Sequence, residues 1–174
     1  MDTHELLLAL SDAIASRPDL TGDRAWTEAI AEHFNRTCPA DCTTWAIRFR
    51  DADRGEYLCD IVWARHGDGQ WRSYGGLELA VETEWETSAD EHCHDFAKLL
   101  DVRAHRRLFV GAHPSASWGA HDDRVALFHD MICSHRAWRA DDEIGVLLWR
   151  NGGDFEHRCW AFAGRGLRIV VDHA

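Results

Sequence analysis

The segments EYLCDIVWA (residues 56–64) and GLELAVETEW (residues 76–85) decide how this chain is expected to fold. The first is a nearly continuous apolar run, which is typical of a central strand that is covered on both faces. The second has the length and alternation of a strand, and the turn residues Gly67-Asp68-Gly69 separate the two. A third alternating segment, TTWAIRFR (residues 43–50), precedes them, so the sequence predicts a three-stranded meander.

Segments with helical periodicity flank this predicted meander. Apolar residues recur at helical spacing over residues 2–16 and from Thr21-Gly22-Asp23 to near Cys38-Pro39, so two helices are expected before it. After it, the pattern predicts in order a helix (89–104), a strand (107–112), a helix (121–136) and two strands (143–149 and 155–163). Residues 167–171 are left open as one more strand. The order α-α-β-β-β-α-β-α-β-β predicts an α/β (or α+β) fold with one mixed central sheet flanked by helices.

Length and composition fit one globular domain. The chain has 174 residues, of which 45% are hydrophobic, and this is enough to bury a sizeable core without a disulfide or a metal. No apolar run reaches the roughly 18 residues of a membrane span, and the first residues lack the basic region of a signal peptide, so we expect a cytoplasmic protein with no membrane segment. The six cysteines are then expected to be reduced. A structural zinc site needs two closely spaced pairs of ligands, and the sequence has only one such pair of cysteines, Cys38 and Cys42.

The charge balance counts against a protein that binds phosphate backbones. Thirty acidic residues outnumber nineteen basic ones, which gives a formal net charge of −11, whereas non-specific DNA affinity comes from clustered Lys and Arg. Eighteen of the basic residues are arginines, and Lys98 is the one lysine. Lysine is a compact charge whose pKa can be tuned for catalysis. Two interpretations of Lys98 are therefore open: a functional role, or a solvated charge on a helix that pairs with Asp95 or Asp101.

Carboxylates on the two central predicted strands form the main candidate site. Asp60 lies within an apolar strand, where a carboxylate is costly unless something neutralises it. Glu82 and Glu84 share one face of the next strand with Glu78, and neighbouring strands would hold such groups close together. A divalent cation relieves the repulsion between like charges, and oxygen ligands suit Mg²⁺ or Mn²⁺. Two plainer readings remain: the glutamates line a solvated strand face, or Asp60 pairs with an arginine such as Arg103.

This arrangement resembles the PD-(D/E)xK nuclease superfamily, which has the restriction-endonuclease-like fold. Asp60 matches the family's Asp, and Glu82-Thr83-Glu84 matches its (D/E)xK, with Glu84 where the lysine is expected. Some members carry the lysine on the following helix, which is where Lys98 is expected. The resemblance covers residues 28–112, roughly half of the chain, and implies a single domain. Its core would be at about residues 22–112, with a C-terminal helix and β-hairpin as an extension.

The resemblance implies metal-assisted hydrolysis of phosphodiester bonds in DNA. Asp60 and Glu82 would hold Mg²⁺ or Mn²⁺, which polarises the phosphate and acidifies a water. Glu84 or Lys98 would orient or deprotonate that water, and Lys98 could also offset charge in the transition state.

Further roles follow from the same resemblance. A glutamate on the helix before the meander, Glu28 or Glu32, would be the supporting acid. Members of this fold often form dimers, so a dimer is a further expectation. The DNA would be held by arginines, for which the candidates are Arg103, Arg106 and Arg107, together with Arg48 and Arg50.

The alternative is a catalytically inactive member of the fold that acts as a binding or regulatory protein. The net charge of −11 and the glutamate in place of the motif's lysine favour this alternative, and its partner would be a protein rather than DNA. A third reading is an acidic protein that mimics DNA. The acidic residues are interspersed with arginines, however, and a DNA mimic needs a surface covered with carboxylates.

Overall fold

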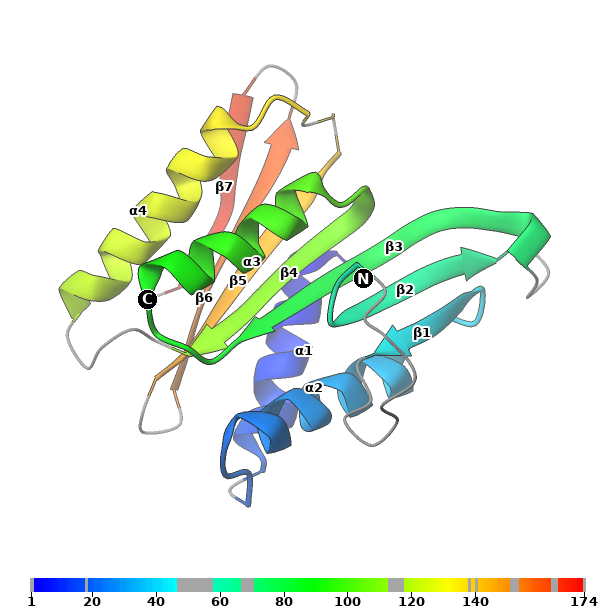
Figure 1. Ribbon diagram of the computed structural model, residues 1–174, viewed down its shortest axis with the longest axis horizontal. Helices are drawn as coiled ribbons and strands as arrows, with labels where there is room; N and C mark the ends of the chain where they lie inside the picture. Colours follow the sequence, from blue (N-terminus) through cyan, green and yellow to red (C-terminus); the bar gives the residue numbers. More distant parts are fainter. Residues whose placement is uncertain are drawn as a thin grey trace.

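A mixed seven-stranded sheet forms the centre of the described residues of the protein in a computed structural model (Figure 1). The structure describes residues 2–17, 19–46, 58–66, 71–112, 118–137, 139, 141–150, 154–163 and 166–173. Its helices are α1 (Thr3–Ala15), α2 (Asp23–Thr37), α3 (Ala89–Asp101) and α4 (Trp118–Ser134), with a short 3-10 turn at Trp71–Ser73. Its strands are β1 (Cys42–Ala46), β2 (Ile61–His66), β3 (Tyr74–Glu84), β4 (Ala104–Ala112), β5 (Glu143–Arg150), β6 (Asp154–Ala163) and β7 (Gly166–His173). The predicted α/β class and element order are confirmed, and the open segment at residues 167–171 belongs to β7.

The order of the strands in the sheet follows the chain from β1 to β7. β1, β2 and β3 are antiparallel, β3, β4 and β5 are parallel, and β5, β6 and β7 are antiparallel again. α3 and α4 connect the parallel strands and cover one face of the sheet, while α1 and α2 pack on the other (Figure 1). The carboxyl ends of β3, β4 and β5 therefore meet at one edge, and open α/β sheets bind their ligands at such an edge.

Two hydrophobic cores, one on each side of the sheet, hold the helices in place. Under α3 and α4, Phe96 and Phe128 stack with ring centroids 4.2 Å apart, and Phe109 of β4 lies against both. Under α1 and α2, Leu7 and Phe34 are fully buried. Burial on both sides explains why the central strands carry apolar residues on both faces.

The predicted start of the second strand is wrong. β2 begins at Ile61 rather than at residue 56, because Leu58 takes a left-handed backbone conformation (φ 67°) that interrupts a strand. Asp60 precedes β2, and Leu58, an expected apolar neighbour of Asp60, is 61% exposed. The expectation that Asp60 lies in the middle of an apolar strand is therefore wrong. Residues 47–57, which include part of the predicted first strand, lie outside the described residues.

The boundary between α3 and β4 also differs from the prediction. α3 ends at Asp101 rather than at residue 104, because Val102 is already extended (φ −72°, ψ 133°). β4 therefore begins at Ala104 rather than at residue 107. As a result Arg106 joins Arg107 within the strand, and the two side chains point to opposite faces of the sheet.

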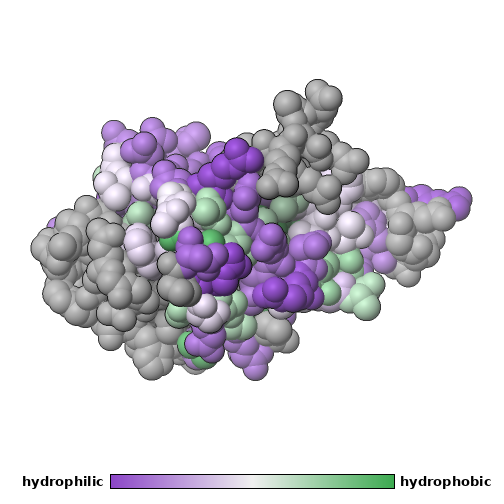
Figure 2. Space-filling view, turned by 90° about the horizontal axis from the view of Figure 1, so that it is seen from below, coloured by the Kyte–Doolittle hydropathy of each residue, from purple (hydrophilic) through white to green (hydrophobic). Residues whose placement is uncertain are grey.

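The described part of the surface seen from below is mostly hydrophilic. Figure 2 shows hydrophilic residues over much of the described part of this face, with the hydrophobic residues in small separate patches. Among the described residues, the exposed large hydrophobic side chains are Leu8, Leu58 and Tyr74. No helix in the described part of the chain combines the length and the apolar character that crossing a membrane requires.

Replacing Gly145 with alanine should destabilise the protein, because α1 packs closely on β5 at this point. A Cβ at residue 145 would lie 2.7 Å from Leu7 Cδ1, 2.9 Å from Thr3 Cγ2 and 3.0 Å from Leu108 Cδ2. We expect the free energy of unfolding in urea to fall by about 1–3 kcal/mol. Gly75→Ala is the matched control, since its Cβ would touch only the flexible Arg65 side chain at 3.4 Å. Equal stability of the two variants would contradict this close packing.

Candidate active site

Glu82 and Glu84 lie at the carboxyl end of β3, on the side of the sheet that α3 covers. Along β3, Ala80 belongs to the core under α3 and Val81 to the core under α1 and α2, so Glu82 and Glu84 face α3. Glu82 is 1% exposed, and Glu84 is half-buried. A carboxylate buried as deeply as Glu82 needs a partner that offsets the loss of water.

Lys98 of α3 supplies such a partner. Its Nζ lies 3.4 Å from Glu82 Oε1 and 3.0 Å from Asp95 Oδ1. Lys98 and Asp95 share one face of the helix because residues three apart lie one above the other. The Lys98 side chain is 32% exposed, so the ammonium group is in reach of water as well as of the buried carboxylate. The structure thus brings two of the predicted catalytic residues, Glu82 and Lys98, together.

The carboxyl group of Glu84 has a raised pKa. Burial is the main cause, and the neighbouring Asp95 carboxyl raises the pKa further. The backbone N–H of Glu86 donates to Glu84 Oε1 over 2.7 Å and opposes this shift. Glu84 therefore takes up a proton more readily than an ordinary glutamate, which suits a general base or acid.

Asp60 is fixed beside this end of β3 by Thr83, the residue between the two glutamates. Asp60 Oδ2 accepts hydrogen bonds from the backbone N–H of Thr83 (2.8 Å) and from its hydroxyl (2.5 Å). β2 and β3 pair Ile61 with Val81, so Asp60, one residue before β2, follows next to Glu82 in the same register. The Asp60 side chain thus accepts the hydrogen bond of the Thr83 backbone N–H at a point where β2 has not yet begun and offers no backbone partner. A metal shared by Asp60 and Glu82 stays a prediction.

The predicted supporting acid lies on the other side of the sheet. Glu28 is on α2, is 41% exposed and pairs with Arg24 one helical turn earlier, with Arg24 Nε 3.0 Å from Glu28 Oε1. Glu32 lies one turn further along the same helix and is also exposed. The contacts of Glu82 and Lys98 are on the α3 side, so the described structure does not bring Glu28 into contact with them.

Arg106 is engaged within the protein, at the end of β4 away from Glu82. It pairs with Glu78, which also pairs with Arg65 at 2.6 Å. Burial raises the pKa of the Glu78 carboxyl, but hydrogen bonds from the two arginines outweigh it, so the pKa is lowered. Glu78 therefore belongs to an ion-pair cluster rather than to a solvated face with Glu82 and Glu84.

Arg107 and Arg103 border a different pocket, at the amino end of β4. Arg107 is 5% exposed, and its Nε donates to the carbonyl oxygen of Val102 over 3.0 Å. Arg103 is exposed and lies just before β4. The structure therefore places the predicted DNA-binding arginines away from the carboxylates, while Arg48 and Arg50 lie outside the described residues.

Two further residues belong to the site beyond the predicted catalytic set. Asp95 contacts Lys98, one of the two pairings expected from helical spacing, and it also raises the pKa of Glu84. Cys59 is buried, and burial together with Glu82 raises the pKa of its thiol. Its thiol therefore stays protonated near neutral pH, which excludes Cys59 as a nucleophile.

An aromatic pocket lies at the same edge of the sheet, on the α2 side. Trp26 of α2 is flanked by Trp85 and Trp149, with ring centroids 5.8 Å and 4.7 Å away. The three indoles line a cavity of about 440 Å³. Trp85 directly follows Glu84, and since successive residues of a strand face opposite sides, the carboxylates and the tryptophans flank one edge.

The donor atoms of the site suit a hard divalent cation. On the α3 side, Glu82, Glu84 and Asp95 offer carboxylate oxygens. The Asp60 carboxylate is hydrogen-bonded to Thr83, whose hydroxyl also lies 3.4 Å from that of Thr27 on α2. Mg²⁺ commonly takes one or two carboxylates and completes its shell with water and substrate phosphates. Among the described residues, no group of three or more His, Cys, Asp or Glu side chains forms a metal cage. The described residues therefore do not by themselves assemble a metal cage here, and a bound divalent ion stays a prediction.

Comparison with known proteins does not assign a family. No family model matches the chain, and no curated protein has a significantly similar sequence. The function is therefore inferred from the residues of the site.

Proposed function

We propose that this protein is a nuclease that hydrolyses phosphodiester bonds in DNA with the help of Mg²⁺ or Mn²⁺. The observation that carries the proposal is the contact of the chain's single lysine with the buried carboxylate of Glu82 at the carboxyl end of β3. Burying a carboxylate is costly, and a fold that needed only stability would fill this position with an apolar side chain. Perturbed ionisable groups that gather at a ligand-binding edge are typical of catalytic sites.

Each residue has a role that its surroundings support. Asp60 and Glu82 would hold the divalent ion, which polarises the phosphate and acidifies a bound water. Glu84, with its raised pKa, is the better base for that water. Lys98 offsets the negative charge that develops on the phosphate, and Thr83 keeps the Asp60 carboxylate in place.

The aromatic pocket supports a nucleic-acid substrate. Bases stack on accessible aromatic faces regardless of sequence, and the half-buried Trp26, Trp85 and Trp149 line a cavity beside the carboxylates. A DNA strand that crosses this edge of the sheet would place a phosphate group on the α3 side and a base on the α2 side. Stacking would also supply affinity that does not depend on basic residues, which suits a chain with a net charge of −11.

Cleavage assays with the purified full chain test this proposal. We expect cleavage of single-stranded or duplex DNA in millimolar Mg²⁺ or Mn²⁺ and none in EDTA. Glu82→Gln should lower the rate at least ~100-fold, which is the usual effect of removing one group that stabilises the transition state. Glu86→Gln is the matched control, since residue 86 is exposed and lies two positions beyond Glu84.

Two outcomes would overturn the proposal. If neither metal supports cleavage of either DNA by the wild-type protein, the protein is an inactive member that acts through binding. The ion pairs of Arg106 and Arg107 within the protein favour that alternative, because they occupy groups that DNA would otherwise contact. If Glu82→Gln cleaves as fast as the wild-type protein, the active site lies elsewhere.

A further inference from the structure

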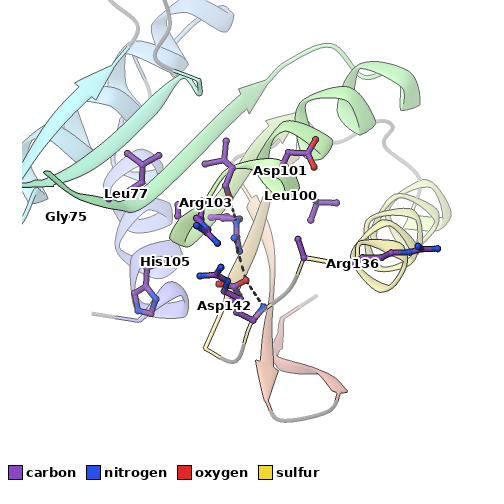
Figure 3. A pocket seen from close by; sticks show the side chains of 14 residues that line it. Gly75, Leu77, Leu100, Asp101, Arg103, His105, Arg136 and Asp142 are labelled. Carbon is purple, nitrogen blue, oxygen red and sulfur yellow. Dashed lines mark hydrogen bonds and ion pairs between the residues drawn. The ribbon is translucent and has the colours of Figure 1, made fainter.

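A second pocket lies at the opposite edge of the sheet, at the amino ends of the parallel strands. It has a volume of about 590 Å³ and lies between the start of β3, the end of α3 and the connection from α4 to β5 (Figure 3). Pockets of 300–1,000 Å³ are the usual size of small-molecule sites. Nothing in the proposed nuclease site uses this pocket.

The lining of this pocket is basic, although the chain as a whole is acidic. Four arginines and two aspartates contribute charges to it, which leaves a formal charge of +2 in a protein of net charge −11. Arg136 extends away from the other labelled side chains in Figure 3, and without it three arginines still face two aspartates. The charged lining residues are Arg103, Arg107, Arg136, Arg139, Asp101 and Asp142.

Both aspartates of the pocket have partners within the protein. Asp142 Oδ2 accepts a hydrogen bond from the backbone N–H of Arg139 (2.9 Å) and lies 3.6 Å from Arg107 Nη2. Asp101 Oδ1 lies 3.2 Å from His135 Nε2. The carboxyl end of α3 also borders the pocket and is equivalent to roughly −0.5 charge. These negative groups do not cancel the arginines.

Two of the arginines are available to a ligand. Arg103 and Arg139 are exposed, and their side chains make no hydrogen bond or ion pair in the part of the chain that the structure describes. Arg103 directly precedes Ala104, the β4 partner of Leu77, and Arg103, Leu77 and Asp142 all line the pocket (Figure 3). Arg107 also lines the pocket and is buried. Burial lowers the pKa of its guanidinium group, and the nearby Asp142 carboxylate opposes that shift. An anion that entered the pocket would be attracted by all three guanidinium groups.

We propose that this pocket binds the phosphate group of a small molecule. Guanidinium groups bind phosphate through pairs of parallel hydrogen bonds, and several arginines around one cavity match the three oxygens of a phosphate better than the two of a carboxylate. Ala104 at the pocket and Phe109 beside Glu82 are five residues apart, which is about 16 Å along a strand. The pocket is therefore separate from the proposed nuclease site, and the proposal does not depend on that activity.

Calorimetric titration of the full chain with inorganic phosphate tests the proposal, with ribose 5-phosphate and acetate as further ligands at constant ionic strength. We expect phosphate to bind with a Kd below about 1 mM. Replacing both Arg103 and Arg139 with glutamine should weaken binding at least ~10-fold, because both charge and paired hydrogen bonds are lost. Arg36→Gln, which removes an exposed arginine on α2, should bind like the wild type. Tighter binding of ribose 5-phosphate would identify an ester as the natural source, and tighter binding of inorganic phosphate would identify the free anion.

A second measurement avoids the risk that the double variant is misfolded. In ¹⁵N NMR spectra of the wild-type protein, phosphate should shift the amides of Gly75, Gly76 and Arg103 at the pocket and leave that of Glu82 unchanged. The proposal fails if phosphate shifts none of the pocket amides, if the folded double variant binds as tightly as the wild type, or if acetate binds as tightly as phosphate.

Discussion

Replacing Lys98 with methionine should abolish the metal-dependent cleavage of DNA. Methionine keeps the length and the apolar stem of the side chain but removes the ammonium group that lies 3.4 Å from Glu82 and 3.0 Å from Asp95. With that charge gone, the metal ion alone would offset the negative charge that develops on the phosphate. We expect the cleavage rate at saturating DNA and metal to fall at least ~100-fold.

The Lys98→Arg variant separates the need for charge from the need for lysine. Arginine keeps a positive charge, but its planar guanidinium group is bulkier and more weakly hydrated. It also does not give up a proton near neutral pH, as a lysine with a tuned pKa can. We expect Lys98→Arg to remain well below wild-type activity. Glu91→Gln, on an exposed position of α3, controls for general effects on the helix. If Lys98→Met cleaved DNA at the wild-type rate, Lys98 would have no part in the mechanism.

Most of the fold is predictable from the sequence because the signals that define it are local. The alternation of residues 43–46 and 76–84, the apolar run at residues 61–64 and the helical periodicity of α1 to α4 each depend on near neighbours along the chain. The start of β2 could not be predicted in this way. It depends on the left-handed conformation of Leu58 and on the Thr83 bonds that hold Asp60, and neither appears in a pattern of apolar residues.

The contact between Glu82 and Lys98 was predictable in part. The glutamates were candidates because they match a known motif, and Lys98 because it is the one lysine and lies on the next helix; the structure brings Glu82 and Lys98 together, and their role in catalysis stays a prediction. The positions of the arginines could not be predicted in this way. Val102 is extended and ends α3 early, so β4 begins at Ala104 and includes Arg106 as well as Arg107, at the far end from Glu82. Arg106 and Arg107 then find acidic partners inside the protein, in Glu78 and Asp142.

The pairing of Glu82 with Lys98 should also be visible in the stability of the protein. Lys98→Met leaves the Glu82 carboxylate, which is 1% exposed, without its nearby ammonium group. Breaking a fully buried pair costs about 3–5 kcal/mol, but Lys98 is 32% exposed and water screens part of the interaction. We therefore expect the free energy of unfolding in urea to fall by about 1–3 kcal/mol.

The double variant Glu82→Leu with Lys98→Met should recover most of this loss, because it removes both charges and leaves an apolar pair beside the core under α3. A double-mutant cycle in urea gives the coupling energy of the pair directly. Additive losses would show that the two groups do not interact in solution. A double variant as stable as the wild type but unable to cleave DNA would show that the charges are kept for the reaction. The fold would then be bearing a polar pair at a position that an apolar pair fills equally well.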